Sequence, residues 1–198
     1  MGKYFGTDGF RGEANVDLTV EHAYKVGRYL GWYYSQNGKA KVVIGKDTRR
    51  SSYMFEYALV SGLTASGADV YLLHVTTTPS VSYVVTSEEF DCGIMISASH
   101  NPYYDNGIKI LDGNGHKMDA GVENLIEQYI DGLIDELPYA TKDEIGCALD
   151  YSIGRNRYIG YLMSIPTRAF RNYRVGLDCA NGASSCLLYT SPSPRDCS

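Results

Sequence analysis

Short β-branched runs alternate along this chain with longer helical segments, and this alternation is the feature that most constrains the fold. Residues 41–45, 69–75 and 92–97 form apolar runs of strand length between Gly-, Pro- and Thr-containing turns. Residues 51–67 carry apolar side chains at helical spacing, and residues 79–87 open with a proline that suits a first helical turn. The β-α-β-α-β order predicts an α/β fold, a three-layer α/β/α sandwich with a mixed, mostly parallel sheet. Ligands of such sheets bind at the carboxyl ends of the strands.

Two further amphipathic helices are predicted at residues 19–36 and 119–136. Asp119 stands where an N-cap is needed, and Ser51 with Ser52 is expected to cap the helix that they open.

A domain boundary is predicted near Asp150, after a polar and mixed segment, so that residues 1–150 form one domain. Residues 151–185 are expected to contain a linking helix and the truncated start of a second, similar domain, with its first strand at 173–182. Residues 186–198 hold Ser-Pro repeats and little apolar surface. We expect them to be a foreign tail, disordered or artefactual.

Composition excludes several classes of protein. The 198 residues carry a net charge of −5 without long charged runs, which argues against binding to nucleic acid or to a membrane surface. No signal peptide is visible at the start, and no apolar stretch approaches the ~20 residues of a membrane span, so a cytoplasmic protein is expected. The five cysteines are scattered without a CxxC pair, so neither a disulfide framework nor a zinc site is indicated.

Three polar, Gly-containing loops are candidates for chemistry: residues 5–12, 45–51 and 97–107. Arg11 and Arg49 lie in the first two, and an arginine fork suits phosphate oxygens. Each arginine could instead pair with its neighbouring aspartate, Asp8 or Asp47. Together with a loop rich in hydroxyls, the arginines favour an anion-binding site.

The third loop places Ser99 where an apolar strand leaves the sheet, a position that exposes a nucleophile on a rigid support. Residues 107–111 alternate as a second strand, with Lys109 facing away from its apolar neighbours. If the two strands pair antiparallel, Ser99 and Lys109 lie near the same mouth, within roughly 5–8 Å. Lys109 could then exchange a proton with an attacking hydroxyl, provided that burial and nearby arginines lower its pKa.

Other interpretations of this loop stay open on pattern alone. A Ser-rich strand end before Asn-Pro is also typical of a plain turn. A serine hydrolase using Ser99 and His100 is disfavoured, because adjacent side chains of an extended strand point to opposite faces and no G-x-S-x-G motif is present. His100 is interpreted as an orienting hydrogen-bonding group.

At this point the residues resemble a known family. The segments "KYFGTDGFRG", "VVIGKDTRRS", "TTPSVSYV", "GIMISASHNPYYDNGIKI" and "VGLDCANGASS" occur in the order and at the spacing found in the α-D-phosphohexomutases. The likeness covers roughly residues 3–185 and is nearest to members acting on glucosamine phosphates. It implies the first domain of that family and the beginning of its second.

The resemblance implies that Ser99 carries a phosphoryl group, passes it to O1 of glucosamine 6-phosphate and recovers phosphate from the resulting 1,6-bisphosphate. Glucosamine 1-phosphate, a precursor for peptidoglycan, would be the net product. Lys109 would match the general acid/base, Arg11 and His100 would line the cleft, and Arg49 is a candidate for binding the phosphosugar substrate. Mg²⁺ would bind a phosphoryl oxygen on Ser99.

The chain departs from the family pattern by lacking the metal loop, the sugar-selecting loop and the phosphate clamp of the three later domains. We therefore expect an amino-terminal fragment that is inactive alone. Phosphomannomutase or phosphoglucomutase activity, and a non-catalytic phosphosugar-binding module, remain alternatives, and the oligomeric state is not readable from the sequence.

Overall fold

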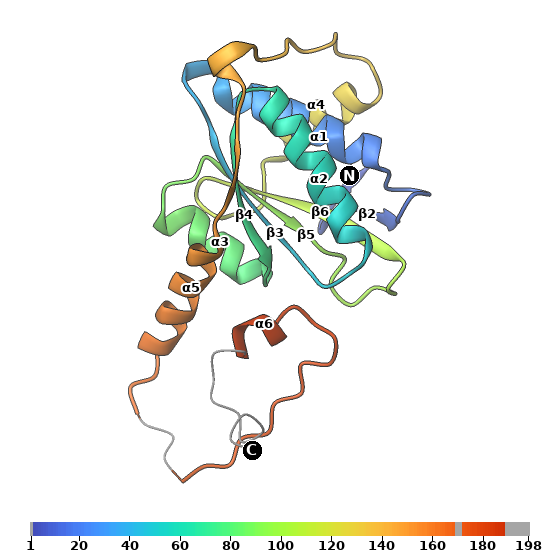
Figure 1. The fold of residues 1–198 in the computed structure, drawn as a ribbon. Helices are drawn as coiled ribbons and strands as arrows, with labels where there is room; N and C mark the ends of the chain where they lie inside the picture. Colours follow the sequence, from blue (N-terminus) through green and yellow to red (C-terminus); the bar gives the residue numbers. More distant parts are fainter. Residues whose placement is uncertain (1, 169–171, 189–198) are drawn as a thin grey trace.

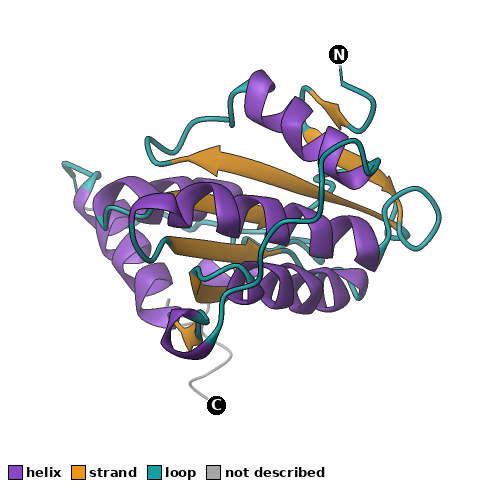
Figure 2. Ribbon diagram, turned by 90° about the horizontal axis from the view of Figure 1, so that it is seen from above, coloured by secondary structure: helices purple, strands orange, loops and turns teal. Residues whose placement is uncertain are grey.

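A computed structural model of the chain describes residues 2–168 and 172–188, and shows one sheet with helices on both faces (Figures 1 and 2). The strands are β1 (Phe5–Gly6), β2 (Gly9–Glu13), β3 (Lys41–Lys46), β4 (Asp69–Val75), β5 (Cys92–Ile96), β6 (Asp105–Asp112) and β7 (Ala148–Asp150). The α-helices are α1 (Val20–Tyr34), α2 (Ser51–Ala65), α3 (Thr78–Ser87), α4 (Ala120–Ile130), α5 (Ser152–Ser164) and α6 (Ser185–Leu188). Two short 3₁₀ turns, η1 (Ser35–Asn37) and η2 (Lys142–Glu144), complete the described elements.

The seven-stranded sheet has the order β1-β2-β6-β5-β3-β4-β7. Strands β5, β3, β4 and β7 pair in parallel, whereas β6 runs antiparallel to both β5 and β2. Strand β2 therefore points the same way as the parallel group, and only β1 and β6 run against it. The predicted mixed, mostly parallel sheet is confirmed.

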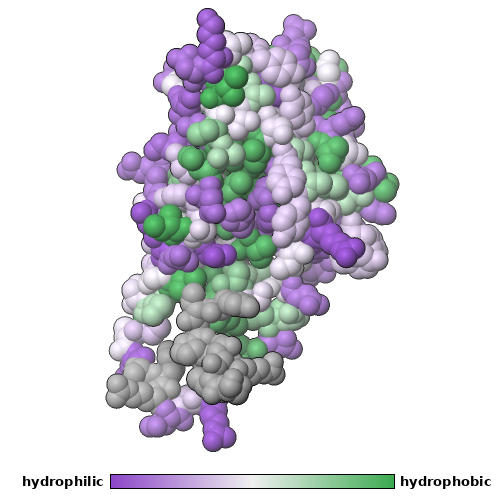
Figure 3. Space-filling model, in the orientation of Figure 1, coloured by the Kyte–Doolittle hydropathy of each residue, from purple (hydrophilic) through white to green (hydrophobic). Residues whose placement is uncertain are grey.

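The two faces of the sheet bury different side chains. Helices α1, α2 and α4 cover the face that presents Ile94, Ile108 and Ile110. On the other face, α3 packs over Met95 and Leu111, with α5 beside it. Because Lys109 alternates with Ile108 and Ile110, it belongs to the α3 face. On the side of the molecule drawn in Figure 3, hydrophobic and hydrophilic residues are intermingled.

Several predicted boundaries shift for local reasons. Helix α4 ends at Ile130, short of the predicted residue 136, since Gly132 takes a left-handed φ of 72° just beyond it. The Asp119 cap is confirmed through its bond to the Gly121 amide. The expected serine cap of α2 is wrong: the capping position is Arg50, and no side chain caps this end. Residues 5–12, expected as a loop, form a β-hairpin whose second strand joins β6.

The predicted strand at 173–182 does not form within the described residues, where 173–179 have no assigned secondary structure. A single strand without a partner cannot satisfy its backbone groups, and no second sheet is available to receive it among the described residues. Most of the predicted tail, 189–198, lies outside the described residues. In the part of the chain that the structure describes, no helix combines the length and apolarity required to traverse a bilayer.

Helices α1 and α2 pack with their backbones unusually close. A Cβ at Gly27 would lie 2.5 Å from the Leu59 carbonyl oxygen, and one at Gly62 would lie 2.7 Å from the Arg28 amide and nearer still to the Tyr24 carbonyl. Such contacts with backbone atoms cannot be relieved by side-chain rotation. The α1–α2 layer thus depends on these two glycines.

We expect Gly62→Ala to destabilise the fold by about 1–3 kcal/mol, because the backbone clash outweighs the gain in helix propensity of about 1 kcal/mol. Gly160→Ala in α5 is the matched control, since its Cβ would meet nothing within 4 Å. That substitution should stabilise by about 0.5–1 kcal/mol. Urea unfolding of both variants measures these changes. If Gly62→Ala and Gly160→Ala changed the stability equally, the close backbone contact at Gly62 would not limit its side chain.

Glu127 of α4 ties the first residues of the chain to the sheet. Its carboxylate accepts hydrogen bonds from the backbone amides of Lys3, Tyr4 and Phe5 at 2.8, 2.7 and 2.7 Å. Burial by itself raises the pKa of this carboxyl, but the three amides outweigh burial and leave the pKa lowered. The ionised form of Glu127 is therefore stabilised by folding.

Glu127→Gln should reduce the free energy of unfolding at pH 7 by about 1–3 kcal/mol, since it weakens three hydrogen bonds to a buried charge. Because the folded pKa lies below the unfolded value of about 4.3, this stabilisation is complete above that pH and disappears as the pH falls through the folded pKa. Urea unfolding at pH 7 and at low pH should show the wild-type advantage shrinking. Glu144→Gln, at an exposed residue, should change the free energy of unfolding little. If the difference between wild type and Glu127→Gln were the same at both pH values, the ionised Glu127 would not be the source of the stabilisation.

Candidate active site

A cleft of about 1010 Å³ opens at the carboxyl ends of β3 and β5. The loop after β3, the start of α3, the loop after β5 and residues 181–184 line it. The last segment is tied to the β3 loop by a hydrogen bond of 2.6 Å from the Thr48 hydroxyl to the Asn181 carbonyl. This is the edge of the sheet at which the strand order predicts a ligand.

Ser99 lies in this cleft with its side chain exposed. Its φ of 57° is left-handed, a conformation that costs a non-glycine residue about 1–2 kcal/mol. The Ser99 amide donates to the Ser97 hydroxyl at 3.0 Å, and the Ser99 hydroxyl lies 3.4 Å from Nδ1 of His100. The loop therefore turns sharply out of a buried strand and presents a hydroxyl to solvent. The expectation that the side chains of Ser99 and His100 point to opposite faces is wrong, because Ser99 is left-handed rather than extended and His100 lies beside its hydroxyl.

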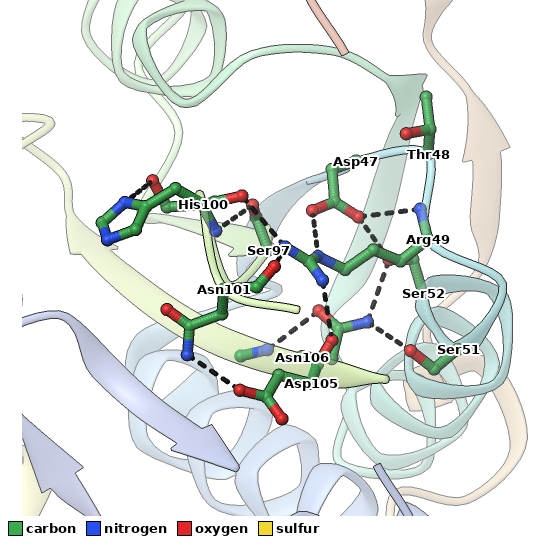
Figure 4. Close-up of polar contacts among 12 residues, drawn as sticks. Asp47, Thr48, Arg49, Ser51, Ser52, Ser97, His100, Asn101, Asp105 and Asn106 are labelled. Atoms are coloured by element: carbon green, nitrogen blue, oxygen red, sulfur yellow. Dashed lines mark hydrogen bonds and ion pairs between the residues drawn. The ribbon is translucent and has the colours of Figure 1, made fainter. Parts of the chain in front are cut away.

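The guanidinium of Arg49 holds this loop in place (Figure 4). Nε donates to the Asp47 carboxylate at 2.9 Å. The terminal nitrogens donate to four backbone carbonyls of the loop, those of Ser99 (2.9 Å), Asn101 (2.9 Å), Pro102 (2.5 Å) and Asp105 (3.1 Å). An arginine has five N–H donors, and here each has an acceptor.

Arg49 is therefore committed to the protein itself in this structure. The alternative pairing with Asp47, left open from the sequence, is present, and the loop carbonyls take the remaining donors. A phosphate contact by Arg49 would require it to release one of these bonds. Its role as a substrate ligand stays a prediction, while its contacts assign it to positioning the loop.

Asn106 completes the support and was missed at the sequence level. Its side chain is fully buried and donates to the hydroxyls of Ser51 and Ser52 at 2.8 and 3.0 Å. The Ser52 hydroxyl in turn donates to Asp47 at 2.8 Å. Asn-Gly is a common turn signal, yet here both residues lie in β6. Only the tertiary partners show that this asparagine links the Ser99 loop to α2.

Lys109 and Arg11 come together on neighbouring strands, beside the cleft. Met95 of β5 pairs with Lys109 of β6, and Arg11 of β2 pairs with Gly107. The antiparallel pairing predicted for these β5 and β6 segments is confirmed, and Lys109 shares the sheet face of Met95, which lines the cleft with Ser99. Neither cation is itself among the lining residues.

Asp8 lies between these two cations. Its carboxylate is 3.4 Å from the Arg11 guanidinium and 3.8 Å from the Lys109 amine. The pairing of Arg11 with Asp8 was the alternative left open from the sequence; the approach to Lys109 was not foreseen, because the hairpin that carries Asp8 was expected to be a loop. An anionic ligand that reaches Arg11 or Lys109 has to compete with this carboxylate.

The described residues do not form a metal site by themselves. Nowhere within 2–168 and 172–188 do three His, Cys, Asp or Glu side chains cluster at ligating distance. Asp47, the acidic residue lining the cleft, is already engaged by Arg49 and Ser52. Ser99 could offer a phosphoryl oxygen to a hard cation, but the other ligands would have to come from elsewhere.

Comparisons with known proteins agree with this geometry. Residues 2–135 match the family model described as phosphoglucomutase/phosphomannomutase, alpha/beta/alpha domain I. The chain is 72% identical over 185 residues to a phosphoglucosamine mutase of Lachnoclostridium phytofermentans and 70% identical over 187 residues to one of Lachnospira eligens. Each alignment covers 93% of this chain but only 41% and 42% of the relative, so the chain spans about two fifths of their length.

Among solved structures, a phosphoglucomutase/phosphomannomutase family protein from Burkholderia thailandensis superposes with a TM-score of 0.68 at 24% identity. The match covers 85% of this chain and 38% of that one, and it supports the fold alone. The family model spans most of the present sheet and both of its helical layers. The chain therefore belongs to the phosphoglucomutase/phosphomannomutase family, and its residues 2–135 are the α/β/α domain I of that family.

Proposed function

We propose that this chain carries the phosphoserine domain of a phosphoglucosamine mutase, an enzyme that interconverts glucosamine 6-phosphate and glucosamine 1-phosphate. The observation that carries the proposal is the exposed Ser99 hydroxyl, held on a clamped left-handed turn at the strand ends. The choice of glucosamine rests on the relatives that are 72% and 70% identical. Because the chain spans two fifths of those relatives, turnover is proposed for a protein of their length and not for this chain alone.

In the proposed reaction, the phosphorus–oxygen bond to Ser99 breaks as a bond forms to O1 of glucosamine 6-phosphate. The O1 proton passes to a base, for which Lys109 is the candidate, and Ser99 is left as an alkoxide that regains a proton. The 1,6-bisphosphate then presents its other phosphate to Ser99, and the reverse transfer releases glucosamine 1-phosphate. Arg11 and His100 would hold the substrate near Ser99, since phosphoryl transfer depends chiefly on positioning and charge neutralisation.

Mg²⁺ is part of the proposed enzyme, where it would neutralise charge on the phosphoryl group of Ser99. The described residues do not make its site, so no step is assigned to it here. We also propose a cytoplasmic location, a domain limit near Asp150, and residues 151–185 as the passage to a second domain.

Two alternatives stay open because the chain spans about two fifths of its relatives' length. Phosphomannomutase or phosphoglucomutase activity would use the same Ser99 chemistry, because no described contact selects one hexose. A non-catalytic phosphosugar-binding module would use the same cleft without transfer to Ser99.

Incubation with glucosamine 1,6-bisphosphate should add one phosphate to the chain, mapped to Ser99 by intact mass and fragmentation. Ser99→Ala should take up none. A parallel incubation with glucose 1,6-bisphosphate compares phosphate uptake from the two sugars. A wild-type chain that binds the phosphosugar but stays unmodified would contradict the mutase proposal and support the binding module.

Arg49→Lys should loosen the Ser99 loop, because one ammonium cannot satisfy four carbonyls and a carboxylate. We expect amide exchange at Asn101 and Asp105, which bond to the Ala98 and Pro102 carbonyls, to accelerate roughly tenfold or more. Phosphate uptake at Ser99 should fall with it. Arg168→Lys, at an exposed residue, is the control; unchanged exchange in the loop would show that Arg49 does not position it.

A further inference from the structure

The proposed chemistry places more negative charge in the cleft than the cations described so far can meet. A phosphorylated serine carries about −1.5 to −2 charges near neutral pH, and so does the phosphate of an incoming sugar. Phosphate groups are held by charge-assisted hydrogen bonds, above all from guanidinium groups. The arginines that line the cleft are Arg49 and Arg50.

Arg49 cannot meet this need as it stands, because its five donors are bonded to Asp47 and to four loop carbonyls. Arg50 differs from Arg49 in its exposure and in its contacts. It is exposed, it lines the cleft together with Ser99, and its guanidinium makes no hydrogen bond or ion pair with any described residue.

The surroundings of Arg50 also favour an anion. Arg50 precedes the first turn of α2, and α3 begins at the same cleft. Neither helix has a side-chain cap or an acidic residue in its first turn. At the start of α2 the Asp47 carboxylate accepts from the Ser52 hydroxyl and the Arg49 amide, whereas no described carboxylate bonds to the start of α3, so the positive end of the α3 dipole is the one that favours an anion. The Thr77 hydroxyl, at the capping position of α3, is buried at the cleft wall without a hydrogen-bond partner among the described residues.

We propose that Arg50, rather than Arg49, supplies the guanidinium that binds a phosphate monoester in this cleft, which Thr77 and the start of α3 also line. This deepens the proposed function and rests on it for the identity of the ligand. Two sources share this chemistry: a soluble phosphosugar, and the phosphoryl group on Ser99.

The test is calorimetric titration of the whole chain with inorganic phosphate and with glucosamine 6-phosphate. Arg50→Gln should weaken binding of both roughly tenfold, as loss of a charge-assisted contact predicts. Arg50→Lys should retain part of the affinity. Thr77→Val should weaken binding by a smaller factor. Arg168→Gln, which removes the same charge from an exposed residue that does not line the cleft, should leave binding unchanged.

The phosphoserine source is examined by ³¹P NMR of chain phosphorylated on Ser99, where Arg50→Gln should shift the phosphate titration to higher pH because a neighbouring cation is lost. If Arg50→Gln changes only the ³¹P NMR titration, Arg50 binds the phosphoserine. If it weakens only the calorimetric binding of phosphate and glucosamine 6-phosphate, Arg50 binds the soluble ligand. The proposal is overturned if Arg50→Gln matches wild type in both arms, or if wild type binds no phosphate. Failure of Ser99 to accept phosphate would instead overturn the mutase function, and phosphate binding that still depends on Arg50 would keep the subsite.

Discussion

The five-way donation by Arg49 is the constraint on which the rest of the site depends. A loop that leaves a sheet loses its ladder partners, and its carbonyl groups then need donors from elsewhere. One planar guanidinium supplies them for most of the turn around Ser99, and Asp47 fixes the plane of that guanidinium. The conformation of the β5 loop is thus set by the β3 loop, and the left-handed φ of Ser99 is held by contacts made outside its own segment.

Charge in this region is largely balanced within the protein. Lys46, at the end of β3, is buried against Glu56 of α2, and Asp47 neutralises Arg49. Asp8 forms ion pairs with both Arg11 and Lys109. Buried or shared pairs of this kind favour a defined geometry more than they favour binding. A ligand anion therefore meets a region whose cations already have partners, and of the two arginines that line the cleft Arg50 is the one without a partner among the described residues.

The sheet core was predictable because its signals are local. The strands from Lys41, Asp69 and Cys92 and the helices between them were predicted within a few residues, since their apolar runs are continuous and their turns carry glycine, proline or threonine. The position of Ser99 at a strand end followed from the same pattern. The hairpin at Phe5–Glu13 did not, because its strands are short and rich in glycine and are stabilised by β6 far along the chain.

The supporting network of the site was equally hidden. Nothing in "DNG" or "DTRRS" distinguishes a turn from a buried link, and the division between Arg49 and Arg50 depends on which carbonyls lie nearby in space. The prediction extended α4 to residue 136 because the apolar residues keep helical spacing that far. The helix ends at Ile130 instead, because Gly132 adopts a left-handed conformation. The strand predicted to start at residue 173 does not form, because pairing requires a neighbouring strand that the described residues do not contain.

The anchoring of Lys3, Tyr4 and Phe5 by Glu127 has a consequence for the order in which the molecule is made. The hairpin that presents Arg11 is fastened by a residue more than one hundred positions downstream. As the chain leaves the ribosome, these three hydrogen bonds can form only after α4 has emerged. The hairpin that carries Arg11 can pair with β6 before that point, but its anchoring is completed only once residue 127 has been made.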